Sequence, residues 1–146
     1  MHQTFRKPSR IERHFNRFFG VLAGLGIGRS HNYRLSVRGR ISGHIYSTPV
    51  NVLRMGAKTF LVSPRGETQW ARNVRDSGEL SLKRGNDEAS YRASEIDSEA
   101  KIEILRDYIG RCALTVQRYF TVAPQDSDKA YQATAQYHPV FELHRN

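Results

Sequence analysis

The stretch that decides the fold reads NYRLSVRGRISG and spans residues 32–43. Its first part alternates: Tyr33, Leu35 and Val37 are separated by polar residues, which predicts a half-buried strand over 32–38. The glycines at positions 39 and 43 bound a short turn, after which a second strand is expected over about 44–53. Pro49 interrupts that strand and indicates an edge, a bulge or a kink. The sequence therefore predicts an antiparallel hairpin here.

Further short strands and helices are expected after this hairpin. Turn residues at 55–58 and 84–87 separate apolar or alternating runs, which is typical of hairpin-linked strands. The expected strands cover 59–62, 79–83, 87–96 and 137–143, and the expected helices cover 68–77, ended by Gly78, and 99–112. Residues 113–136 are ambiguous and partly helical, with Pro124 as a breaker. This order favours a mainly β (α+β) fold, a small antiparallel barrel with peripheral helices.

Composition and charge narrow the class of protein. A chain of 146 residues with one cysteine, Cys112, indicates one globular body without a disulfide framework, in a reducing, cytoplasmic compartment. No apolar run is long enough for a membrane span. None of the six histidines has a metal-ligand spacing, so no metal site is expected. The formal net charge is +9, and residues 1–44 hold nine basic residues against Glu12 alone.

This basic leading segment includes a predicted amphipathic helix over 9–23. Ile11, Phe15, Phe18, Phe19 and Leu22 fall at helical spacing, with arginines elsewhere on the helix. The helix either packs its aromatic stripe onto the body or lies on an anionic membrane surface, at the inner face of the membrane. The expected division is therefore an N-terminal helix and linker over 1–31 and a barrel over 32–146.

The turn after the first strand has the composition of an anion site. Gly39 and Gly43 allow close backbone approach, Arg40 has a guanidinium that matches phosphate, and the Ser42 hydroxyl can donate one more hydrogen bond. A glycine-bounded turn between strands is also the ordinary form of a plain hairpin. Spacing alone leaves both interpretations open.

A resemblance favours the anion site. Residues 39–43 (GRISG), followed by Thr48-Pro49-Val50, resemble the G-R-K-S-G and P-L signature of the deazaflavin-dependent nitroreductase family. Residues 62–73 (VSPRGETQWARN) are similar to that family's glycine-containing loop and P-x-W-x-x-N segment, and residues 138–143 (HPVFEL) to its closing strand. The resemblance implies a Greek-key-like split β-barrel. It also implies an oxidoreductase that passes a hydride from a reduced 8-hydroxy-5-deazaflavin (coenzyme F-420) to a quinone, a nitro compound or a similar acceptor.

The resemblance also implies which residues hold the coenzyme. The turn would receive its phosphate and tail, the 48–50 stretch would border its ring, and the loop and short helix would lie on the other side. The implied coenzyme-binding residues are Gly39, Arg40, Ser42, Gly43, Thr48, Pro49, Val50, Arg65, Gly66, Trp70 and Asn73. No catalytic side chain is required, because the coenzyme itself carries the hydride.

Two positions depart from the family pattern, and each removes a positive charge. Ile41 stands where Lys is usual, and Tyr46 stands where many members have Arg. FMN is the alternative coenzyme on this ground, and a flavin- or lipid-binding protein without turnover is the alternative function. Trp70 is interpreted as a core anchor, with ring stacking as the alternative, and Tyr119 and Phe120 either pack in the core or line a substrate pocket.

Partners follow from the same observations. The implied partner is a small-molecule electron acceptor, and a homodimer is a further expectation. A sequence pI of about 10.1 invites a nucleic-acid binder. The aromatic residues near the N-terminal arginines, however, sit at helical core spacing rather than on a strand face. No specific nucleic-acid partner is therefore expected.

Overall fold

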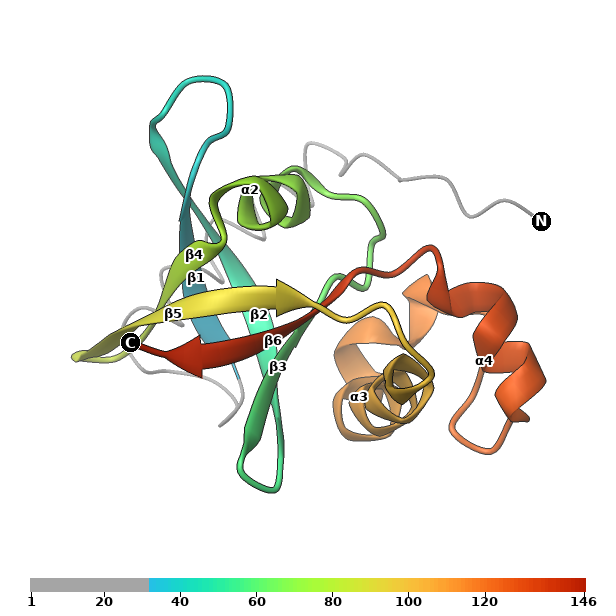
Figure 1. Ribbon diagram of the computed structural model, residues 1–146. Helices are drawn as coiled ribbons and strands as arrows, with labels where there is room; N and C mark the ends of the chain where they lie inside the picture. The colour runs from blue at the N-terminus through green and yellow to red at the C-terminus, as the bar shows by residue number, and fades with distance from the viewer. Residues whose placement is uncertain (1–31) are drawn as a thin grey trace.

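The computed structural model describes residues 32–146, and of residues 113–115 it describes the backbone alone. Six strands of this part close into a barrel in the order β1-β2-β3-β6-β5-β4, with the helices outside it (Figure 1). Every strand pair is antiparallel. The prediction of a mainly β antiparallel barrel with peripheral helices is confirmed. The predicted helix over 9–23 and the segment 1–31 lie outside the described residues.

The first hairpin forms as the alternation predicts. β1 (Asn32–Arg38) pairs along its whole length with the first half of β2 (Ile45–Met55). β2 pairs with β3 (Lys58–Val62) only from Val52 onward, so among the described strands residues 45–51 have β1 as their sole neighbour. Pro49, which has no N–H to donate, lies in this singly paired part, so of the three expected settings (an edge, a bulge or a kink) the structure shows a local edge. The end of the hairpin extends past the barrel (Figure 1).

The last strand closes the barrel. β6 (Val140–Arg145) lies between β3 and β5 (Asp87–Glu95), while β4 (Glu79–Arg84) joins β5 to β1. The interior is filled by apolar side chains that these strands alternately turn inward, together with two from the helix that follows β3: Leu35, Val37, Val50, Val52, Leu61, Ala71, Val74, Leu80, Leu82, Tyr91, Phe141 and Leu143. The first hairpin thus reaches the later strands on both sides of the closed barrel, through β3 next to β2 and through β4 next to β1.

Helix α2 (Gln69–Ser77) covers the barrel on the side of the first hairpin (Figure 1). Thr68 begins it as a cap, because its side chain accepts a hydrogen bond from the Ala71 N–H at 3.2 Å. Gly78 ends it in the left-handed region, with φ +70°, as the sequence predicts. Ala71 and Val74 are fully buried, so this short helix is fixed on the barrel by its apolar stripe.

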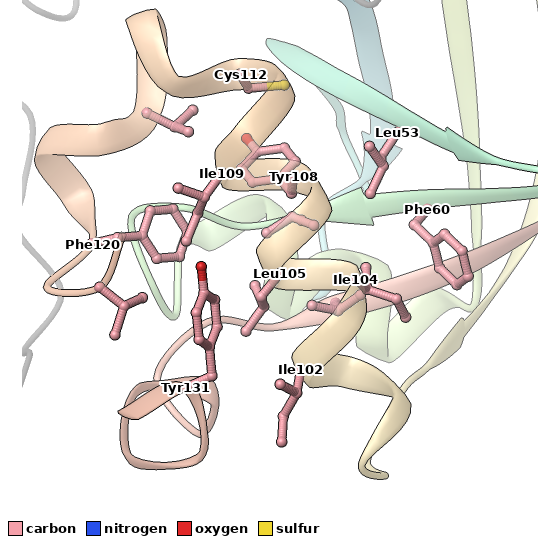
Figure 2. Packing of buried hydrophobic residues seen from close by; sticks show 14 residues of the cluster. Leu53, Phe60, Ile102, Ile104, Leu105, Tyr108, Ile109, Cys112, Phe120 and Tyr131 are labelled. Carbon is pink, nitrogen blue, oxygen red and sulfur yellow. The ribbon is translucent and has the colours of Figure 1, made fainter. Parts of the chain in front are cut away.

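A second core lies beneath the remaining helices (Figure 2). Helices α3 (Ala100–Val116) and α4 (Asp128–Ala135) and the 3₁₀ turn η1 (Gln117–Tyr119) enclose it. Tyr108 and Tyr131, both almost fully buried, are the largest side chains at its centre. The backbone of α3 is non-helical at Cys112, the residue where the sequence predicts the helix to end. Residues 113–136 are partly helical, as expected.

Among the helices of the described residues, none has the length and apolar character that crossing a membrane requires.

Candidate functional site

The bend between β1 and β2 is held by its own backbone. The Gly39 N–H donates to the His44 carbonyl at 2.7 Å, and the Gly43 N–H donates to the Gly39 carbonyl at 3.0 Å. Gly43 has φ +75°, where a side chain would strain the backbone. Arg38 adds a third constraint, because its Nη1 donates to the Gly43 carbonyl at 3.0 Å. The bend is therefore more than a plain two-residue turn.

Gly39 is required for a different reason, namely space. A Cβ built at this position would lie 2.6 Å from Cε2 of Tyr46 and 3.0 Å from Oγ of Ser42. The Tyr46 hydroxyl lies 3.1 Å from the Ser42 hydroxyl, which also accepts a hydrogen bond from the His44 N–H at 3.2 Å. The tyrosine that departs from the family pattern thus packs across Gly39 and fixes Ser42.

Arg40 joins the bend to α2. Its backbone N–H and its Nη1 both donate to Oδ1 of Asn73, at 3.1 and 2.8 Å, and its Nη2 donates to Oε1 of Gln69 at 2.9 Å. Both acceptors are neutral amides, so among residues 32–146 these contacts orient the guanidinium without neutralising its charge. Two of its five N–H groups are used in these side-chain contacts, which leaves donors for an anion.

The three predicted residues of β2 do not share one face. Thr48 pairs with Leu35, so its side chain points to the barrel interior, as does that of Val50, which is buried among the core residues. Pro49 pairs with Arg34 on the opposite face. The coenzyme ring that the resemblance places here can therefore contact the side chain of Thr48 or that of Pro49, but not both. Val50 lies on the same face as Thr48, in the core.

The loop before α2 is stabilised internally. The buried Ser63 hydroxyl donates to the Gly66 carbonyl at 2.6 Å, and the Thr68 N–H donates to the same carbonyl at 2.8 Å. Gly66 has φ +91°, and a Cβ there would lie 3.1 Å from the Tyr137 carbonyl oxygen. Gly66 is thus required by the loop itself. Arg65 lies with its guanidinium carbon 5.5 Å from the centre of the Tyr119 ring, so it is directed toward η1.

Trp70 anchors α2 to the barrel. It is half-buried against the barrel core, with its ring 6.4 Å from that of Phe141 at 52°. The interpretation as a core anchor fits this contact.

The other face of α2 carries an ion-pair network that the sequence does not reveal. Arg75 binds Glu67 at 2.7 Å and Glu95 at 2.8 Å, although helical spacing places it on the solvated face. These bonds raise the pKa of Arg75, and the Arg75 guanidinium lowers the pKa of Glu67. The network ties the loop, α2 and β5 together, so basic residues on this face of the helix are already neutralised.

Tyr119 and Phe120 belong to the second core. Phe120 is buried and lies 4.3 Å from the ring of His138, while Tyr119 is half-buried and accepts a hydrogen bond from Nη2 of Arg118 at 2.6 Å. Burial lowers the pKa of His138 to about 4, which keeps this ring neutral at physiological pH. For Phe120 the expectation of core packing is confirmed.

The structure thus brings together some predicted site residues and leaves others apart. Arg40 and Asn73, 33 positions apart in sequence, are in direct contact, and Gly39, Ser42 and Gly43 form the bend beside them. Arg65 and Gly66 make their contacts elsewhere, with η1 and with the loop. Gln69 was missed, because a lone glutamine gives no signal in sequence. Within residues 32–146 no group of three or more histidine, cysteine or acidic side chains is placed to hold a metal ion.

Comparisons with known proteins agree on fold and family. The family model described as F420H(2)-dependent quinone reductase matches residues 8–123. A solved structure described as a domain-swapped dimer aligns with a TM-score of 0.58 at 16% identity, over 92% of this chain and 94% of that one. A comparison with the curated proteins finds no match.

Two further structures align in the same way. The F420-H2 dependent reductase FDR-A aligns with a TM-score of 0.53 at 16% identity, over 79% of this chain and 95% of its own. A FAD-binding protein of Mesorhizobium loti aligns with a TM-score of 0.52 at 14% identity, over 97% and 92% of the two chains. At these identities the structures show a shared fold, and the predicted split barrel is confirmed.

Proposed function

Because this chain belongs to the F420H(2)-dependent quinone reductase family, we propose that the bend at 39–43 and the facing side of α2 hold the anionic part of its coenzyme. The protein is an oxidoreductase that reduces quinones with the reduced deazaflavin coenzyme, coenzyme F-420. Family membership decides for the enzyme over the binding protein without turnover. It does not assign residues, so the location of the coenzyme is the proposal.

The observation that carries the proposal is the setting of Arg40. Asn73 and Gln69 orient its guanidinium, which has no carboxylate partner in the part of the chain that the structure describes. The Ser42 hydroxyl and the Arg38 guanidinium belong to the same bend. The contact with Gln69 places the bend against the first turn of α2, where the helix dipole favours negative charge. The donor set therefore fits a phosphate and an acidic tail.

The remaining predicted residues are assigned supporting parts. When bound, the coenzyme supplies the hydride. Thr48 lies on the interior face of β2, and Val50 is buried on the same face; on α2, Trp70 is half-buried and the buried Asn73 orients Arg40. Pro49 contributes backbone shape, and Gly66 and Arg65 hold the loop that leads into α2. We assign no general acid or base to these residues.

The test compares coenzyme affinity in two variants. Arg40→Ala removes the oriented guanidinium, and Arg92→Ala removes an exposed arginine of β5 as a matched control. A charge-assisted contact is worth about 1.5–3 kcal/mol, so Arg40→Ala should raise the dissociation constant of the coenzyme about tenfold or more. The control should leave it unchanged. Equal affinity of Arg40→Ala and the wild-type protein would overturn the assignment.

The same titration decides the choice of coenzyme. Ile41 and Tyr46 remove two positive charges from the bend, and the resemblance alone leaves FMN as an alternative. We propose that the deazaflavin binds more tightly, because its acidic tail adds negative charge that Arg38 and Arg40 can meet. Both coenzymes fluoresce, so parallel titrations give both constants. Tighter binding of FMN would contradict this preference.

Three further assignments are proposals of the same kind. Residues 9–23 give peripheral contact with a membrane, which flotation with liposomes tests. A homodimer forms in solution, which light scattering on eluting protein tests, and a domain-swapped dimer among the aligned structures supports it. A cytoplasmic location is the third proposal, because a chain with a single cysteine, here the buried Cys112, fits a reducing compartment.

A further inference from the structure

The end of the barrel opposite the bend is lined by charged side chains. β1 begins at this end and β2, β4 and β6 finish there, and the turn between β2 and β3 lies far from the bend (Figure 1). Side chains alternate along a strand, so the residues two positions beyond the inward-facing Val52, Leu82 and Leu143 also point to the barrel axis. These residues are Arg54, Arg84 and Arg145. We call these three arginines, together with Tyr33 at the start of β1, the basic mouth.

Tyr33 lies between two of these arginines. Nη2 of Arg54 donates to the Tyr33 hydroxyl at 3.4 Å, and Nη1 of Arg54 donates to Oγ1 of Thr59 at 3.3 Å. From the strand on the other side of β1, the guanidinium carbon of Arg84 lies 5.9 Å from the centre of the Tyr33 ring. The Arg54 carbonyl accepts a hydrogen bond from Nη1 of Arg111 at 2.7 Å, which fixes the backbone near the end of β2. Two guanidinium groups from separate strands therefore converge on one side chain.

The hydroxyl of Tyr33 shows that the field at this place is positive. Burial raises its pKa, but hydrogen bonds and the charges of Arg54 and Arg84 outweigh burial, and the pKa is lowered overall. Within residues 32–146 the side-chain partners of Arg54 are hydroxyl groups, and neither Arg54 nor Arg145 forms an ion pair. Asp87, opposite Arg84 on β5, is the carboxylate that faces the same way. Three arginines and one aspartate leave the basic mouth positive.

We propose that the basic mouth binds a phosphate group, either as the free ion or as the monoester of a small metabolite. Planar guanidinium groups match phosphate oxygens with paired hydrogen bonds. Arg54 uses two N–H donors on the hydroxyl groups of Tyr33 and Thr59, of the five that a guanidinium has. The donors come from β1, β2 and β4, so they approach from three strands. This arrangement suits a phosphate, with three or more oxygens, better than a carboxylate with two.

The proposed phosphate site is separate from the coenzyme site. Tyr33 and Arg38 stand five positions apart on β1, which at about 3.3 Å per residue is roughly 17 Å. Buried apolar side chains, among them Leu35 and Val37, fill the barrel interior between these positions. One anion therefore cannot occupy both places, and the basic mouth shares no residue with the bend or with α2.

The test follows tyrosine signals by NMR in the full-length protein. Tyrosines isotope-labelled at the ζ carbon are observed while inorganic phosphate is added at constant ionic strength, which chloride maintains. Tyr33→Phe assigns the Tyr33 signal, which should shift and saturate. Tyr46 lies beside the bend and reports separately on the proposed coenzyme site. A shift confined to Tyr46, or the absence of a saturable shift at Tyr33, would overturn the phosphate site without bearing on the proposed function.

Two double variants with equal changes of charge separate this site from general attraction. Arg54→Gln with Arg84→Gln removes both guanidinium groups, whereas Arg34→Gln with Lys83→Gln removes two charges from the outward faces of β1 and β4, where these residues pair. The first variant should raise the dissociation constant of phosphate about tenfold or more, since each charge-assisted contact contributes at least that factor. The second should change it by less than about twofold. Equal constants in the two variants would refute the assignment.

A parallel titration with glycerol phosphate identifies the source of the phosphate group. Tighter binding of the ester indicates a phosphorylated metabolite, and tighter binding of inorganic phosphate indicates the free ion; either order supports the site. Should the Arg54→Gln, Arg84→Gln protein not fold, the Tyr33 signal of the wild-type protein decides the proposal by itself.

Discussion

Replacing Asn73 by Asp asks whether the charge of Arg40 is used. Asn73 is 5% exposed, and its Oδ1 accepts both the backbone N–H and the Nη1 of Arg40, at 3.1 and 2.8 Å. Asp is nearly isosteric and keeps an oxygen at that position. The substitution therefore preserves both hydrogen bonds while placing a full negative charge beside the guanidinium.

The substitution should change coenzyme affinity much more than protein stability. Neutralising Arg40 removes a charge-assisted contact with the coenzyme, worth about 1.5–3 kcal/mol, so the dissociation constant should rise about 10- to 150-fold. Stability should change little, because stronger hydrogen bonds to a carboxylate are offset by the cost of desolvating it. We expect the free energy of unfolding to stay within about 1 kcal/mol of the wild type.

The assay is fluorescence titration with the deazaflavin coenzyme, followed by urea unfolding of the same samples. Asn86→Asp, in an exposed turn, changes the net charge equally and serves as the control. The reasoning predicts weak binding in Asn73→Asp alone, with both variants folded. Binding as tight as wild type in a stable Asn73→Asp protein would refute the role of the Arg40 charge and leave Arg40 as a structural clamp.

Two further predictions concern packing and pH. Gly39→Ala, whose Cβ would lie 2.6 Å from the Tyr46 ring, should cost about 1–3 kcal/mol of stability, and the cost should fall in a Tyr46→Ala background, as a double-mutant cycle by urea unfolding can show. His138 has a pKa lowered by burial from 6.5 to about 4, so the unfolded chain binds its proton first as pH falls. The free energy of unfolding that neutral His138 contributes should be fully present above pH 6.5 and should fall by about 3 kcal/mol as the pH falls to about 4. His138→Phe should remove this part of the decline. An unchanged pH profile of stability in that variant would contradict the assignment.

The sequence was sufficient wherever a local rule decided the structure. Alternation in 32–38 predicted β1, Gly78 predicted the end of α2, and Pro49 predicted an irregular place in β2 (an edge, a bulge or a kink), which the structure shows to be a local edge. The ambiguous stretch after Cys112 was not resolved, because its short helices are fixed by packing on Tyr108 and Tyr131 rather than by a strong pattern of their own. Local propensity is a weak guide where tertiary packing supplies most of the stability.

The site was predicted in composition and missed in geometry. The motifs predicted that Arg40 and Asn73 both belong to the coenzyme site. Only the fold shows that the two residues are in contact, because this contact depends on how α2 packs beside β1. Gln69 and the Arg75 network were absent from the prediction for the same reason. Conversely, the motif grouped Thr48, Pro49 and Val50, although strand alternation places Pro49 on the opposite face.

The partners of its arginines explain how the protein keeps a binding surface positive without losing stability. On the face of α2 toward Glu67 and Glu95, Arg75 satisfies its donors with two carboxylates, and the local charge is neutralised. On the face toward the bend, Arg40 satisfies donors of the same kind with amide oxygens, which orient it and leave its charge intact. Fixing both arginines with carboxylates would hold the helix equally well, but it would remove the positive charge that attracts an acidic coenzyme. The neutral partners of Arg40 are therefore the feature on which binding depends, and Asn73→Asp changes that feature alone.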